Sequence, residues 1–382
     1  GCVGGGCTAK ISVVRSPLCE EVRQVFSGWA TQTVRVWAAS RHVEVEWTVG
    51  PIPFLDGLGK EVITRYTTNI SSASRLHTDS NGRDMLERVR CERGADGTDG
   101  RCRAWVPRYN VTEPVAGNYY PVNTQAMIKD STAAFTVLVD RAQGAASLVD
   151  GQMEFMLHRR LLKDDVRGVV EPLNETQAVS RNDWIDEKGV THPEPYRIGK
   201  GLVARGKHTL VLTAPKTAAR RYRKIQEDIY FSPVLGFAVG QTWKTPEFSG
   251  LASALPPNVV LLTMEKQPDA SVLLRVAHRF GVGEDAELSV DAIVSLAKLF
   301  KATHLAKPVG VVEMSLTANQ EKAAMLARRQ RFKEAGPGLG QATPAKGGGY
   351  AAGILHSTPP AGKGMTIKLA PLQIRTFLLK YA

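Results

Sequence analysis

Apolar and polar residues alternate along much of this chain with a period of two, the pattern typical of β-strands that bury one face. Residues 32–37 and 41–49 alternate on either side of an Ala39-Ser40 turn, as the two arms of a hairpin do. The same pattern predicts strands at residues 62–67, 126–129, 134–139 and 152–157, separated by turn formers such as Asn81-Gly82 and Asp150-Gly151. We therefore expect a mainly all-β protein with a large antiparallel β-sandwich.

The pattern continues through the second half of the chain. It predicts strands at residues 200–213, 232–239, 258–264, 271–280, 365–369 and 372–379. Helices are predicted at 215–228 and at 319–334, the latter with Asn319 as N-cap, whereas 291–301 fits a helix or a pair of strands. A stretch rich in Pro, Ser and Gly at 242–257 marks a boundary. Two domains are expected, a β-sandwich over 1–245 and a smaller β-domain over 246–382, with a low-complexity loop at 335–353.

Composition is that of an ordinary globular protein, with 382 residues, 43% hydrophobic and 23% charged. The net charge of +12 favours anionic partners, and Arg220, Arg221, Arg223 and Lys224 form either a basic patch or a solvated helix face. The remaining Lys and Arg are dispersed, without a zinc-finger or RNA-binding signature, so nucleic-acid binding is not expected. No apolar run approaches the roughly 20 residues of a membrane span, so none is expected.

Cysteines and glycosylation sequons point to the secretory pathway. The five cysteines stand at 2, 7, 19, 91 and 102, and Cys91 and Cys102 flank a charged loop rich in Gly and Asp. That pair forms either a disulfide across the loop or two free thiols. Three Asn-X-Ser/Thr triplets begin at Asn69, Asn110 and Asn174.

Candidate catalytic chemistry is sparse. The eight His are isolated, with no HExxH, His-x-His or Cys-x-x-Cys spacing, so no metal site is expected within this chain. The densest charged segment contains His158, Arg159, Arg160, Asp164, Asp165 and Arg167. Adjacent carboxylates on an extended chain point to opposite sides, so Asp164 and Asp165 are expected to pair with nearby Arg. The segment is either a solvated strand end or a ligand site.

Residues 140–168 (DRAQGAASLVDGQMEFMLHRRLLKDDVRG) resemble the corresponding stretch of lysosomal-type α-mannosidases of glycoside hydrolase family 38. Further blocks match in the same order, at 42–53 (HVEVEWTVGPIP), 59–63 (GKEVI), 78–83 (TDSNGR), 112–123 (TEPVAGNYYPVN), 255–263 (LPPNVVLLT) and 374–378 (IRTFL). The resemblance covers about residues 13–379 and only the carboxyl-terminal region of such enzymes.

This resemblance implies a supersandwich of the galactose-mutarotase-like kind and a zinc-dependent, retaining α-mannosidase. The family's aspartate nucleophile and zinc ligands lie in an amino-terminal α/β-barrel, and none of those motifs occurs here. The chain alone is therefore expected to be inactive, with zinc bound by the full-length enzyme and not by this chain.

The resemblance also implies a partner and a site. The partner is the amino-terminal catalytic domain, and the ligand is a mannose-containing oligosaccharide in the lysosome or another secretory lumen. His158, Arg159 and Arg160 are implied to border the mannose pocket, supported by Asp164, Asp165 and Arg167. Tyr119 and Tyr120 either stack on a sugar or pack in the core. The alternatives are a stand-alone carbohydrate-binding β-module and a basic anion-binding protein.

Overall fold

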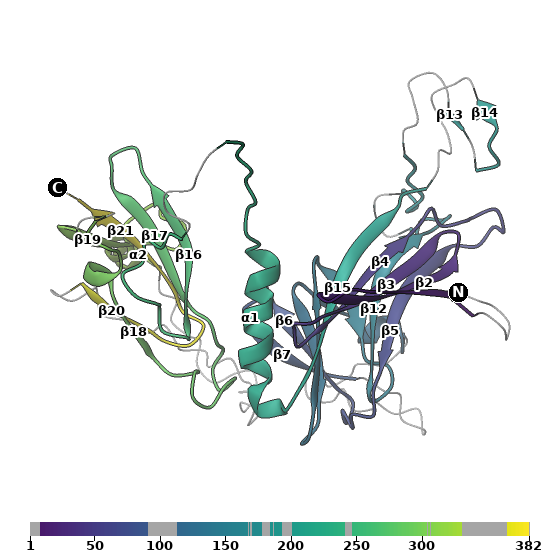
Figure 1. Cartoon of the computed structure of the whole chain (residues 1–382), viewed down its shortest axis with the longest axis horizontal. Helices are drawn as coiled ribbons and strands as arrows, with labels where there is room; N and C mark the ends of the chain where they lie inside the picture. Colours follow the sequence, from purple (N-terminus) through teal and green to yellow (C-terminus); the bar gives the residue numbers. More distant parts are fainter. Residues whose placement is uncertain are drawn as a thin grey trace. The chain divides into compact units, whose positions relative to one another are not determined.

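The computed structural model describes residues 8–90, 113–166, 168, 170–177, 184–185, 187–192, 201–240, 247–303, 305, 307–330 and 365–381. The chain divides into two compact units, Gly1–Phe231 and Ser232–Ala382 (Figure 1). The boundary predicted near residue 245 and the low-complexity loop at 335–353 fall outside the described residues.

The first unit is built on a nine-stranded antiparallel sheet in the order β1-β2-β3-β4-β15-β10-β9-β6-β7. Its strands are β1 (Lys10–Arg15), β2 (Cys19–Ser27), β3 (Ala30–Trp37), β4 (Val43–Val49), β6 (Arg75–Ser80), β7 (Asp84–Val89), β9 (Gln125–Lys129), β10 (Ala134–Val139) and β15 (Ala204–Thr213). The hairpin predicted around Ala39-Ser40 is confirmed, because β3 and β4 pair antiparallel with Val34 opposite Val45.

A four-stranded antiparallel sheet, ordered β5-β12-β11-β8, packs on the nine-stranded one. It contains β5 (Lys60–Thr67), β8 (Tyr120–Val122, preceded by the 3-10 turn η2, Ala116–Asn118), β11 (Gln143–Ala146) and β12 (Gln152–Arg160). Val137 and Val139 of β10 meet Met153 and Phe155 of β12 in a buried core. These alternating residues explain why the two sheets associate, and the predicted antiparallel β-sandwich is confirmed. A short pair, β13 (Trp184–Ile185) and β14 (Thr191–His192), is separate.

Helix α1 (Ala218–Tyr230), preceded by η3 (Pro215–Thr217), lies against β10 and β15 (Figure 1). Tyr222 and Ile225 are buried on one side of this helix, as its amphipathic sequence predicts. Arg223 is also buried, and its guanidinium donates to the carbonyl oxygens of Gly82 (2.8 Å) and Arg83 (2.5 Å). The helix is thereby tied to the β6–β7 turn.

The second unit has its own sheet, ordered β16-β17-β21-β19, from β16 (Val259–Lys266), β17 (Val272–His278), β21 (Ile374–Lys380) and β19 (Gly310–Met314). A two-stranded sheet pairs β18 (Ala292–Ser295) with β20 (Thr366–Leu369), and η4 (Leu296–Lys298) and α2 (Lys322–Arg328) complete the unit. Leu274, Val276, Phe377 and Leu369 form its buried core.

Three details differ from the sequence predictions. The ambiguous residues 291–301 contain a strand followed by a 3-10 turn. Helix α2 begins after Glu321, and Asn319 instead accepts a hydrogen bond from the Ser315 hydroxyl at 2.7 Å. The strand predicted at 232–239 is wrong, because this segment pairs with no strand among the described residues. A strand needs a partner to satisfy its backbone, and alternation alone does not supply one.

Candidate functional site

A β-bulge in β12 decides where the predicted site residues point. Glu154 and Arg159 are five positions apart, so a regular strand would place them on opposite faces. The register with β5 shifts between Met156 and His158, so Glu154 lies opposite Arg65 and Arg159 lies opposite Glu61. Arg65 and Glu61 are four residues apart on β5 and share a face. The bulge therefore returns Arg159 to the outer face of the four-stranded sheet and turns Arg160 inward.

Arg160 is buried, with 3% of its surface exposed. Its Nη1 donates to the Ile52 carbonyl oxygen (2.9 Å) and forms an ion pair with Glu187 (2.5 Å). Its Nε donates to Oδ1 of Asn174 (2.6 Å), and its guanidinium lies 4.2 Å from the centroid of the Phe54 ring. These contacts bind three segments distant in sequence to the end of β12.

Arg159 and His158 are more accessible. The Arg159 side chain is 41% exposed and forms an ion pair with Glu61. The Nε2 atom of half-buried His158 lies 3.0 Å from the carbonyl oxygen of Leu202. Of the three residues implied to contact the sugar, Arg159 presents its guanidinium to solvent and Arg160 does not.

The residues implied to support this site follow β12. Asp164 accepts a hydrogen bond from the Val166 N–H at 2.8 Å, which closes a local turn. Asp165 is exposed, and Arg167 lies outside the described residues. The predicted ion pairs among them stay a prediction.

The predicted modification sites differ in their surroundings. Asn69 is exposed in the loop after β5. Asn174 is half-buried, and its amide oxygen holds Arg160. Asn110, Cys91 and Cys102 lie outside the described residues, so the predicted disulfide stays a prediction.

A second polar cluster on the same outer face was not foreseen from the sequence. The Tyr119 hydroxyl donates to Oε1 of Glu154, and Oε2 of that buried carboxylate accepts from Arg65 at 2.6 and 2.9 Å. Burial and then the bond to Glu154 raise the pKa of Tyr119. The alternation of residues 152–157 carried the signal, because Glu154 stands between the core residues Met153 and Phe155.

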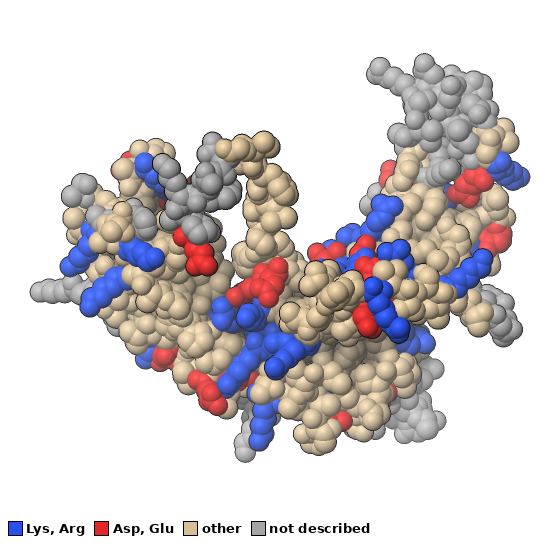
Figure 2. Space-filling view, in the orientation of Figure 1, with Lys and Arg blue, Asp and Glu red and all other residues tan. Residues whose placement is uncertain are grey.

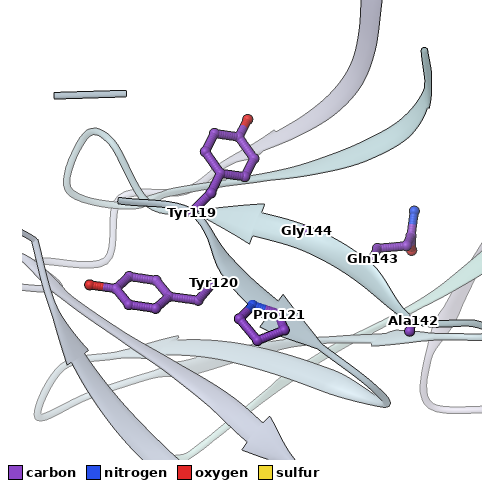
Figure 3. Close-up of a pocket in the computed structure, with 6 residues that line it drawn as sticks. All are labelled: Tyr119, Tyr120, Pro121, Ala142, Gln143 and Gly144. Carbon is purple, nitrogen blue, oxygen red and sulfur yellow. The ribbon is translucent and has the colours of Figure 1, made fainter. Parts of the chain in front are cut away.

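The two tyrosines border an open hollow of about 420 Å³. In Figure 3 their rings point in different directions, Tyr119 beside Gly144 of β11 and Tyr120 away from it. The Tyr120 ring lies 5.0 Å from the guanidinium carbon of Arg88. The hollow is lined by Tyr119, Tyr120, Pro121, Ala142, Gln143 and Gly144. Such an aromatic surface offers a stacking plane for a sugar ring.

Metal ions and anions are two further classes of ligand that the described residues could bind. Within the described part of the chain, no group of three or more His, Cys, Asp or Glu is placed to hold a metal ion, so these residues do not fit a zinc site. Basic side chains gather along the first half of α1 in Figure 2, where Arg220 and Lys224 are exposed. Arg223 is committed to the β6–β7 turn instead. None of the described helices is long and apolar enough to cross a membrane.

Comparison with known proteins identifies the family. Residues 7–167 match the model of the glycosyl hydrolases family 38 C-terminal domain, and residues 258–377 match that of the family 38 C-terminal beta sandwich domain. The chain belongs to glycoside hydrolase family 38. It is a carboxyl-terminal part of a family 38 protein, as the sequence resemblance predicts.

Relatives in family 38 extend well beyond this chain. The lysosomal alpha-mannosidase of Bos taurus is 41% identical over 379 residues, covering 97% of this chain and 33% of the relative. The alpha-mannosidase of Canavalia ensiformis is 39% identical, covering 97% of this chain and 34% of the relative. The chain thus spans about a third of these relatives. The crystal structure of an alpha-mannosidase from Enterococcus faecalis V583 shares the fold, with a TM-score of 0.54, 12% identity, and coverage of 98% of this chain and 35% of that one.

Proposed function

We propose that this chain is the carboxyl-terminal portion of a zinc-dependent, retaining α-mannosidase that removes terminal α-D-mannose from glycoprotein oligosaccharides. The supporting observation is the 41% identity to a lysosomal alpha-mannosidase across 97% of the chain. That relative is a lysosomal enzyme, which supports a lysosomal or other secretory lumen as the site of action.

In this proposal the chain completes the substrate pocket and does not perform the bond cleavage. Retaining hydrolysis needs two carboxyl groups facing each other across the sugar at about 5–5.5 Å. Adjacent Asp164 and Asp165 follow the end of β12 without such an arrangement, and the described residues offer no zinc site. The nucleophile and the zinc ligands are therefore assigned to the amino-terminal part of the enzyme.

Arg159 is the proposed sugar contact. Its guanidinium is exposed, and its N–H groups can donate directional hydrogen bonds to mannose hydroxyls while Glu61 holds the side chain in place. His158 precedes Arg159 on β12 and faces the other side of the strand, with its Nε2 atom 3.0 Å from the Leu202 carbonyl oxygen. Arg160 acts as a positioning residue, because its buried contacts to Ile52, Asn174 and Glu187 fix the chain that carries Arg159.

Hydrolysis of a chromogenic α-mannoside with added zinc tests the proposal. We expect no activity from the chain alone, and activity when it is co-expressed with the amino-terminal part of bovine lysosomal α-mannosidase. Arg159→Ala is expected to lower kcat/KM about 10–100-fold, because a hydrogen bond from a charged group is worth about 1.5–3 kcal/mol.

The matched control is Arg23→Ala. Arg23 is also an exposed arginine paired with a glutamate, Glu21, but it lies on the other sheet. Its loss should change kcat/KM less than twofold. Activity from the chain alone would contradict the assignment of the nucleophile to the missing part, and equal losses in both variants would contradict the role of Arg159.

A carbohydrate-binding module without hydrolytic activity is the second candidate, favoured by the hollow beside Tyr119 and Tyr120. Isothermal titration of the chain alone with methyl α-mannoside distinguishes the two. Binding that Tyr119→Ala abolishes, combined with an inactive co-expressed enzyme, would favour this candidate.

A further inference from the structure

The inner face of the nine-stranded sheet continues beyond the second sheet that covers it. That covering sheet has only four strands, against nine beneath it. On β4 the inward residues Val45, Trp47 and Val49 are buried. Beyond β4, strands β3, β2 and β1 extend the sheet, and β1 pairs with no second strand among the described residues.

Strand register shows that one apolar row of the core face continues across these outer strands. Val45 lies opposite Val34, Val34 opposite Val22, and Val22 opposite Val13, so one row of valines crosses four strands. Exposure rises along that row from 3% at Val45 to 52% at Val13, with Val22 and Val34 half-buried. We name as the open β1–β3 face the five side chains Ile11, Val13, Val22, Val34 and Val36, which share this side of the sheet. Two polar pairs flank the row of valines on the same side, Gln24 with Gln32 and Arg15 with Glu20.

The opposite face of the same strands carries charged side chains that form ion pairs. Arg35 pairs with Glu21 of β2 and with Glu46 of β4, Arg23 pairs with Glu21, and these side chains alternate with the valines in sequence. Basic and acidic side chains are intermixed over this part of the first unit in Figure 2. The charged side also carries the exposed Val14 and Val25, but ion pairs occupy its centre, whereas a row of valines occupies the centre of the open β1–β3 face. A sheet normally buries the more apolar of its two sides.

We propose that the open β1–β3 face docks onto the amino-terminal part of the same enzyme. This inference rests on the proposed function and names the surface that joins the two parts. Both family models are described as C-terminal, and about two thirds of each curated relative lies outside the match. A region twice as long as this chain is therefore connected to it in those relatives. The open β1–β3 face is continuous with the apolar core of the sandwich through Val45 of β4.

The test uses two double variants on the same pair of strands. Ile11→Glu with Val13→Glu places two charges on the open β1–β3 face. Val14→Glu with Val25→Glu is the matched control, because register places Val14 and Val25 on the charged face and they are comparably exposed, at 44% and 43%. Each full chain is co-expressed with the amino-terminal part of bovine lysosomal α-mannosidase, and the complex is measured by mass photometry over a dilution series.

We expect the double variant Ile11→Glu with Val13→Glu to raise the Kd of the complex at least tenfold. The control variant should change the Kd less than threefold. Hydrogen exchange at β1 and β2 of the wild-type chain should slow on assembly. Equal Kd values for both variants and the wild type would overturn the inference while leaving the proposed function intact. Failure of the wild-type chain to assemble would overturn both. The chain could instead form a homodimer that only Ile11→Glu with Val13→Glu disrupts, while the complex with the amino-terminal part is unaffected. That result would assign the open β1–β3 face to a second copy of the chain and would also overturn the inference.

Discussion

At the scale of single residues, the core of the first unit contains a buried hydrogen-bonded histidine, His208. The amide nitrogen of Gln143 donates to the Met156 carbonyl oxygen, so the amide oxygen faces Nε2 of His208 at 2.8 Å. Nε2 therefore carries the proton, and Nδ1 accepts from the Tyr66 hydroxyl at 2.9 Å. The network is complete only when the imidazole is neutral.

This network predicts a loss of stability in acid. Burial lowers the pKa of His208 from its ordinary 6.5 to about 4. Between these values the unfolded chain binds a proton that the folded chain does not, so the stabilisation is complete above pH 6.5 and is lost as the pH falls toward 4. Linkage puts this loss at about 2 kcal/mol between pH 8 and pH 5. Urea titrations at several pH values measure it.

Two variants separate titration from packing. His208→Phe should remove one of the protons taken up on unfolding, so the free energy of unfolding should depend less steeply on pH. The variant should also be less stable at every pH, because Gln143 and Tyr66 lose a hydrogen-bond partner. Tyr66→Phe should lower stability without removing that proton. Burial also lowers the pKa of His77 to about 4, so unfolding should still take up a proton at His77 in both variants. An unchanged slope in His208→Phe would refute the argument.

At the scale of elements, the end of β12 offers a direct comparison of two neighbouring arginines. Arg160→Ala removes the partner of the largely buried Glu187 carboxylate, so we expect a loss of about 3–5 kcal/mol in the free energy of unfolding. Arg159→Ala breaks a partly exposed ion pair and should cost less than about 1 kcal/mol. Chemical denaturation of both variants measures the difference. Similar losses would show that the bulge does not separate their roles.

Sequence alternation predicted about half of the strands of this fold, missed β1 and β2 among others, and could not place the bulge. Strands β9, β10 and β12 begin within a residue of the predicted positions, because apolar residues recur there with a period of two. Strand β11 (Gln143–Ala146) was missed, since its sequence QGAA carries no such signal. The inward turn of Arg160 depends on a register shift between β5 and β12, and its partner Glu187 lies 27 residues away in the sequence. The local sequence pattern predicts neither the register shift nor the ion pair between Arg160 and Glu187.

At the scale of the whole molecule, the two units have separate hydrophobic cores. One core lies between the sheets of the first unit around Val137 and Phe155, and the other surrounds Leu274 and Phe377 in the second. No residue belongs to both of these clusters. Each core is large enough to unfold cooperatively by itself, so thermal unfolding is expected in two transitions.

A matched pair of leucines assigns these transitions. Leu138 of β10 and Leu274 of β17 are both fully buried, one in each unit. Truncating either to Ala should cost about 2–5 kcal/mol, because it removes buried apolar contacts and leaves a cavity. In differential scanning calorimetry, Leu138→Ala should lower the midpoint of one transition and Leu274→Ala the midpoint of the other. If both variants instead lowered a single shared transition equally, the units would unfold as one cooperative body, and loss of either core would disable the whole chain.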